Sequence, residues 1–251
     1  MEAARTGGWR GFATHGWPSG GDTERQVKRM AWIRFQKIFF VALAAVFIAG
    51  TSSADSVDGA ELYEQCAQCH GVNGEGSQFF LAPSIAGMEP WYVESQLRNF
   101  VSGARGLHPD DVGGLRMYPI AKSLKTDNGG TEDEKIAALA NYVGSLPEVV
   151  PAPEVEGGDP EKGAALYVTC QQCHGAKGEG NKQMNAPRLA GTSDWYLVTE
   201  LHQYKQGIRG GNSKNPNAVL MRGMSNMLVD DQAIRDVVAY IATLKPETQE
   251  N

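Results

Sequence analysis

The sequence predicts an all-α fold built from two copies of one small domain. A set of motifs recurs 104 positions later along the chain, which marks an internal repeat. Near the end of each copy, apolar residues recur at the i, i+3, i+4 and i+7 spacing of one helix face. No segment alternates apolar and polar residues over the length of a strand.

The two copies align without a gap over most of their length. The pentapeptide 66–70, Cys-Ala-Gln-Cys-His, recurs as Cys-Gln-Gln-Cys-His at 170–174, and Met117 recurs as Met221. Beyond Leu124 the offset falls to 98, because the first copy carries six extra residues around 127–130. Each copy has about 90 residues, a size at which domains often depend on a metal or cofactor for stability.

The start of the chain is predicted to be a targeting segment. From Met30, a short stretch with Arg34 and Lys37 precedes an apolar run of about a dozen residues and a Ser-x-Ala site ending at Ala54, which is typical of a secretory signal peptide. A membrane-spanning helix needs about 20 apolar residues, so an uncleaved anchor is the less favoured alternative. The predicted organisation is a leader or mis-assigned start at 1–29, a signal peptide at 30–54, domains at 55–147 and 159–246, a Pro- and Glu-rich linker at 148–158, and a tail at 247–251.

Removal of residues 1–54 makes the chain strongly acidic. Seven of the 23 basic and three of the 29 acidic residues lie in that segment, which leaves 16 basic and 26 acidic residues, a net charge of −10. A surface of this sign disfavours nucleic acid and anionic lipid as partners and favours a protein with a basic patch.

Helix boundaries can be predicted at several points. Asp159 and Pro160 supply an N-cap and a first-position proline for a helix that leads to Cys170. Thr131 and Glu134 form a capping box before the next predicted helix. That helix and its counterpart present two matching apolar faces: Ile136, Leu139, Ala140 and Val143, and Ile234, Val237, Val238 and Ile241.

Each Cys-x-x-Cys-His motif predicts covalent attachment of haem c. Two cysteines on one helical turn can form thioethers with the same haem, and the following histidine then becomes an iron ligand. The predicted sites are Cys66, Cys69 and His70 in the first copy and Cys170, Cys173 and His174 in the second. A four-cysteine zinc site, a redox dithiol and structural disulfides are weaker alternatives, because the pairs lie in separate repeats without a βαβ context.

The second axial ligand is expected to be a methionine. Met117 and Met221 correspond between the copies, and we expect both on a Gly-rich loop before a helix. Met224 is the runner-up to Met221, and Met227 is a further competitor. His108 and His202 have no counterparts and are interpreted as surface residues. A haem iron whose two axial positions are filled by histidine and methionine is suited to outer-sphere electron transfer.

The order of these motifs resembles the class I cytochromes c, and the tandem arrangement resembles the two-haem cytochromes c4. After each CxxCH motif come Gly-Glu-Gly, Ala-Pro-x-x-Ala-Gly, Trp-Tyr, Gly-x-Arg and Met. The resemblance covers most of residues 57–245 and implies a small helical domain round each haem. It also implies that the Pro83 and Pro187 carbonyls accept hydrogen bonds from the histidines, and that Arg105 and Arg209 are candidate contacts for haem propionates.

The resemblance implies an electron carrier rather than an enzyme. The expected role is a periplasmic protein that passes single electrons from a respiratory donor to a terminal oxidase or reductase, after loading by the haem-c maturation machinery. Peripheral membrane association stays open. One alternative is the haem-bearing subunit of an enzyme complex such as flavocytochrome c sulfide dehydrogenase. A di-haem peroxidase is less favoured, because Met117 and Met221 would close both irons.

Overall fold

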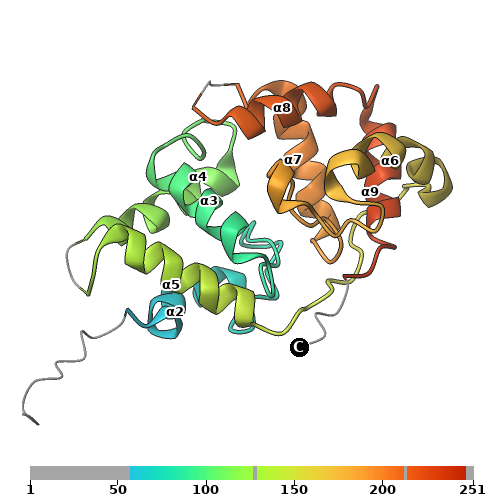
Figure 1. The fold of residues 1–251 in the computed structure, drawn as a ribbon. Helices are drawn as coiled ribbons and strands as arrows, with labels where there is room; N and C mark the ends of the chain where they lie inside the picture. Colours follow the sequence, from blue (N-terminus) through green and yellow to red (C-terminus); the bar gives the residue numbers. More distant parts are fainter. Residues whose placement is uncertain (1–56, 127–128, 212–213, 247–251) are drawn as a thin grey trace, which may run out of the picture. The chain divides into compact units, whose positions relative to one another are not determined.

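In the computed structural model, the described residues are 57–126, 129–211 and 214–246 (Figure 1). They belong to one compact unit that spans residues 55–251. The predicted leader, signal peptide and tail, and Asp127 and Asn128 of the insert, lie outside the described residues. None of the helices within the described ranges is long and apolar enough to cross a membrane.

The described part of the chain is helical, as predicted. The first repeat contains α2 (Gly59–His70), α3 (Pro90–Val101), α4 (Val112–Lys122), the 3-10 helix η1 (Ser123–Lys125) and α5 (Glu132–Ser145). The second repeat contains α6 (Pro160–His174), the 3-10 helix η2 (Lys182–Met184), α7 (Asp194–Gln206), α8 (Pro216–Ser225) and α9 (Asp231–Ile241). Extended pairing among these residues is limited to two isolated bridges, Ser77 with Ala82 and Asn181 with Ala186.

The helix starts follow from capping side chains. Asp159 accepts hydrogen bonds from the first free amides of α6, with Pro160 at the first helical position. Thr131 and Glu134 form the predicted capping box at the start of α5, each accepting from the backbone of the other. These contacts satisfy amides that have no partner inside the helix. Both predicted starts are confirmed.

In each repeat, the helix that carries CxxCH crosses the last helix at a glycine. α2 packs on α5, and α6 packs on α9. A Cβ atom on Gly163 would lie 1.9 Å from the Asp236 carbonyl oxygen, and one on Gly59 would lie 2.3 Å from that of Ala138. Only a residue without a side chain permits so close a crossing. The crossing fixes the direction in which each CxxCH turn leaves its helix.

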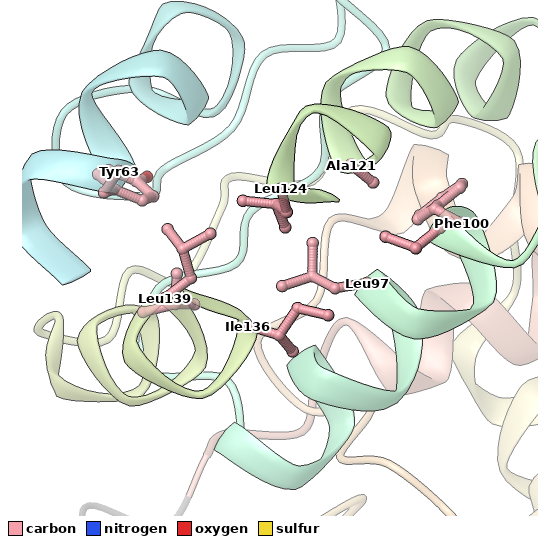
Figure 2. Packing of buried hydrophobic residues seen from close by; sticks show 9 residues of the cluster. Tyr63, Leu97, Phe100, Ala121, Leu124, Ile136 and Leu139 are labelled. Atoms are coloured by element: carbon pink, nitrogen blue, oxygen red, sulfur yellow. The ribbon is translucent and has the colours of Figure 1, made fainter. Parts of the chain in front are cut away.

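The core of the first repeat lies between these helices. Tyr63 of α2, Leu97 of α3 and Ile136 of α5 belong to one buried cluster, and their side chains converge in Figure 2. The second repeat has an equivalent cluster around Tyr167, Ile234 and Val237. The residues predicted from the helical spacing are therefore core residues, as expected: Ile136, Leu139, Ala140, Val143, Ile234, Val237, Val238 and Ile241.

Candidate functional site

Both CxxCH motifs occupy the last turns of a helix. α2 ends at His70 and α6 ends at His174, and each is followed by a glycine with positive φ, 82° at Gly71 and 84° at Gly175. A residue with this positive φ and an extended ψ, 158° at Gly71 and 155° at Gly175, cannot continue the α-helix. The two cysteines and the histidine therefore sit together at the helix end, where a short loop returns over them.

Each histidine is oriented by a proline carbonyl from that loop. The Nδ1 atom of His70 lies 2.9 Å from the Pro83 carbonyl oxygen, and that of His174 lies 2.8 Å from the Pro187 oxygen. A carbonyl can only accept, so Nδ1 carries the proton and Nε2 keeps its lone pair. Burial lowers the pKa of both histidines. A neutral imidazole with a free Nε2 is the form that binds a metal.

A glycine in the loop makes this contact possible. Gly76 has a φ of 82°, and a Cβ atom there would lie 2.4 Å from the Ser84 amide nitrogen. Gly180 occupies the same place in the second repeat, 2.6 Å from the Arg188 amide nitrogen. The Gly-Glu-Gly motif therefore lets the loop lie directly against the proline segment that holds the histidine.

None of the four cysteines in the described part of the chain forms a disulfide. Burial raises the pKa of the Cys66 thiol to about 11, and burial raises the pKa of Cys170 as well. Both are therefore protonated at neutral pH and are weak nucleophiles.

The methionines lie on helices, which corrects one expectation. Met117 is within α4 and Met221 is within α8, whereas the sequence suggested a loop. The reason is local capping: Asp111 accepts from the Gly114 amide, and Asn215 with Pro216 starts α8. These contacts outweigh the low helix propensity of the glycines.

Each repeat has a cavity that is lined by its cysteine and methionine. A cavity of about 310 Å³ in the first repeat is lined by Cys66 and Met117. A cavity of about 330 Å³ in the second is lined by Cys170, Cys173, His174, Met221, Met224 and Met227. Tertiary packing thus brings together a cysteine and a methionine that are 51 positions apart in the sequence. All three methionines of α8 and its end face the second cavity, so its lining does not separate Met221 from Met224.

His108 and His202, which the sequence analysis assigned to the surface, lie apart from the cavity linings. His108 is near Asp110, and His202 is near Asp231, with N–O distances of 3.8 Å in both cases. Neither side chain lines either cavity. This placement agrees with their interpretation as surface residues.

The two predicted propionate contacts have protein partners that the sequence analysis missed. Arg105 and Arg209 both form ion pairs with the buried carboxylate of Glu200. Both also donate to the Gln96 Oε1 atom, at 2.9 and 2.8 Å. The 104-residue offset pairs Gln96 with Glu200. This correspondence between the repeats was the feature of the sequence that could have pointed to Gln96 and Glu200 as partners of the two arginines.

The residues of each repeat fit a haem c group. In the second repeat, a pair of thiols, an imidazole and a thioether sulfur line one largely apolar cavity. In the first repeat, Cys66 and Met117 line the cavity, and His70 lies at the end of the same helix as Cys66. Thiols, imidazole and thioether are the ligand set of a c-type haem. Within the described residues, no three His, Cys, Asp or Glu side chains gather as a metal site, so the zinc alternative gains no support.

Comparisons with known proteins agree with this geometry. The family model "Cytochrome c" matches residues 56–147 and 160–245. Cytochrome c-552 of Acidithiobacillus ferridurans is 28% identical over 83% of this chain and 88% of its own length. A thiosulfate dehydrogenase electron acceptor of Stutzerimonas stutzeri is 31% identical over 76% of this chain and 88% of its own. The structure of Acidithiobacillus ferrooxidans cytochrome c4 is similar with a TM-score of 0.57 and 27% identity, over 72% of this chain and 99% of that one.

The family match extends over both repeats, and each matched range contains one CxxCH motif. The predicted all-α tandem fold is therefore confirmed, together with the two cofactors. The chain belongs to the cytochrome c family, as a two-domain member that carries two covalently bound haem c groups and transfers electrons.

Proposed function

We propose that this protein is a periplasmic carrier that passes single electrons between respiratory redox partners, from a donor to a terminal oxidase or reductase. The observation that carries the proposal begins with a histidine held by a proline carbonyl in both repeats. In the second repeat this histidine and Met221 line one cavity, and in the first repeat Met117 lines a cavity together with Cys66. Two such ligands leave an iron no open position for substrate.

The proposed roles follow the geometry residue by residue. Cys66 and Cys69, and Cys170 and Cys173, attach the haems. His70 and His174 are the nitrogen ligands, and Met117 and Met221 are the sulfur ligands, with Met224 as the alternative to Met221. Pro83 and Pro187 hold the imidazole rings in one orientation, which fixes ligand basicity. The haem iron, when bound, alternates between two oxidation states that differ by one electron.

The proposed cellular location rests on the start of the sequence. Residues 30–54 have the composition of a secretory signal peptide, and c-type haem is attached by a maturation machinery after export. The proposed domains are 55–147 and 159–246, joined by the linker at 148–158. Within that linker, the amides of Glu154 and Val155 both donate to the Asp194 carboxylate at 2.8 Å. The linker is thus tied to the start of α7.

A second candidate is the electron-accepting subunit of an enzyme complex. The relative from Stutzerimonas stutzeri that is named as a thiosulfate dehydrogenase electron acceptor favours this candidate. A flavocytochrome c sulfide dehydrogenase subunit is another example of the same arrangement. Both candidates require the same haem domains and differ only in whether the partner is bound permanently.

Isolation under native conditions separates the two candidates. The protein is produced in its exporting host and followed by haem absorbance through size-exclusion chromatography at low and moderate salt. We expect elution at the mass of one chain, intact mass increased by two haems, and uptake of two electrons per chain in a reductive titration. Co-elution with a flavin- or haem-bearing catalytic subunit would instead support the subunit role. Absence of added haem at either cysteine pair would overturn both.

A further inference from the structure

The two haem domains contact each other through reciprocal hydrogen bonds. The Ser84 amide donates to the Ser193 hydroxyl at 3.2 Å, and the Arg188 amide donates to the Glu89 carboxylate at 3.2 Å. The 104-residue offset converts Ser84 into Arg188 and Glu89 into Ser193, so each contact is the counterpart of the other. Reciprocity of this kind is the property of an isologous interface, in which the same surface of each copy is used.

Two arginines occupy the same interface and are counterparts of each other. Arg105 donates to the Tyr196 hydroxyl at 2.9 Å and to Glu200, both in the second domain. Arg209 donates to Gln96 in the first domain at 2.8 Å. Each guanidinium also lies over an aromatic ring of its own domain, Arg105 over Phe100 and Arg209 over Tyr204, at 4.7 and 4.8 Å from the ring centres.

The acceptors between the arginines break this symmetry in charge. Gln96 and Glu200 are counterparts: Gln96 accepts from both guanidinium groups, and Glu200 forms ion pairs with both. Because one position is an amide and the other a carboxylate, two positive charges face one negative charge. Among the described residues, Glu200 is the one carboxylate that either guanidinium pairs with. The cluster of Arg105, Arg209, Gln96 and Glu200 therefore carries a net charge of about +1.

This charge is buried, which requires a further partner. The side chains of Arg105 and Glu200 are each 9% exposed, and that of Arg209 is 6% exposed. The Nε atom of Arg105 is buried and has no hydrogen-bond partner within the described residues. Burial lowers the pKa of Arg209, and repulsion from Arg105 acts in the same direction. An uncompensated charge in such a place is strongly unfavourable unless an anion pairs with it.

The position of the cluster indicates which anion this is. Gln96, Glu200 and Arg209 all line the cavity that contains Cys170, His174 and Met221. No member of the cluster lines the cavity of the first domain. A haem attached at Cys170 and Cys173 has two carboxylates within its own structure, and it is the negatively charged group that this cavity is built to hold.

We propose that the cluster is a carboxylate-binding subsite at the domain interface, that it takes one propionate of the second haem, and that Gln96 keeps it positive. The inference rests on the proposed haem ligation in the second repeat. The positive charge of the cluster offsets the negative charge of this propionate, which would otherwise favour the oxidised form of the second haem, and so stabilises the reduced form relative to the oxidised form. The subsite therefore raises the potential of the second haem relative to the first and draws the electron toward the second domain.

The charge of the subsite can be altered in both directions without a change of side-chain size. Gln96→Glu makes the cluster neutral, and Glu200→Gln raises its charge by one. The double variant Gln96→Glu/Glu200→Gln restores the original charge with the carboxylate moved to the first domain. Gln183→Glu is the matched control, because Gln183 is exposed in the second domain and does not line the cavity. Each holoprotein is titrated spectroelectrochemically, with the first-domain wave identified by Met117→Ala.

For Gln96→Glu, we expect the one-electron equilibrium between the haems to move about tenfold away from the second haem, or about 59 mV. Glu200→Gln is expected to move it in the opposite direction, and the double variant should lie within about threefold of the parent. If Gln96→Glu fails to load haem, Glu200→Gln carries the test alone. Shifts no larger than that of Gln183→Glu, in fully loaded protein, would overturn the subsite. Failure of the parent to load the second haem would overturn the ligation itself.

Discussion

At the scale of single residues, each proposed histidine ligand is held by a neighbour that the sequence pattern also contains. The imidazole of His70 is fixed by the Pro83 carbonyl, and Gly76 allows the loop to come that close. The second repeat reproduces this arrangement at His174 and Pro187, with nearly the same distance. Repetition of the contact in two independent copies indicates that orientation of the ring, rather than mere burial, is what these prolines provide.

The methionine ligands can be tested one domain at a time. In oxidised holoprotein, a methionine–iron bond gives a weak long-wavelength absorption band. We expect Met117→Ala and Met221→Ala each to remove about half of this band, because each opens one iron, and to lower the potential of that haem. Met224→Ala is the matched control and should keep the full band. A full band in Met221→Ala, together with its loss in Met224→Ala, would reassign the ligand of the second domain.

At the scale of helices, the crossing of α6 with α9 positions the haem-bearing turn. Gly163 lies against the Asp236 carbonyl, and one turn further along α6, Tyr167 packs against Tyr240 with ring centres 5.2 Å apart. The first repeat has the same crossing at Gly59 and the same ring distance. A side chain at the crossing glycine would separate the two helices and move the CxxCH turn away from its proline segment.

The close crossing of α6 and α9 predicts that alanine at position 163 destabilises the fold strongly. Gly163→Ala should lower the free energy of unfolding by about 2 kcal/mol or more, because a Cβ atom would overlap backbone that cannot move freely. Gly223→Ala in α8 is the control: no atom lies within 4 Å of a Cβ there, so alanine should stabilise the helix by about 0.5–1 kcal/mol. Urea unfolding of the holoproteins, followed by circular dichroism, measures both. Equal effects at the two positions would contradict the packing argument.

At the scale of the whole molecule, the net charge of the surface and the buried charge at the domain interface act over different distances. The chain without residues 1–54 carries about ten more acidic than basic residues, with 26 against 16. This surface field attracts or repels approaching redox partners over roughly a Debye length. The buried positive cluster at Arg105 and Arg209 acts on the haems themselves, where water does not screen it. The acidic surface therefore acts on the encounter with redox partners. The buried positive cluster at the domain interface acts on the distribution of the electron between the two haems.

The surface charge predicts the salt dependence of electron exchange. Oxidation of the reduced protein by a cationic inorganic complex should slow as the salt concentration rises from about 10 mM to about 500 mM, because screening weakens the attraction. With an anionic complex, the rate should rise over the same range. Stopped-flow absorbance at a haem band measures both. Identical salt dependence for the two complexes would show that the acidic residues do not surround the site of electron exit.

The sequence alone determined the features that depend on neighbours along the chain. The repeat, the CxxCH turns, the helix caps at Asp159 and Thr131, and the apolar face of α5 all follow from residues within a few positions of one another. The resemblance to a family added the proline carbonyls, which lie only 13 positions from their histidines.

Only the tertiary structure decided what lies between the domains. Arg105 and Glu200 are 95 positions apart, and nothing local to either predicts that they pair. The helical setting of Met117 was also missed, because the Asp111 cap had to be weighed against three nearby glycine and proline residues. Helix formation is a local balance that sequence patterns report well. The placement of a buried charge depends on which surfaces come together, and packing of the whole chain determines that.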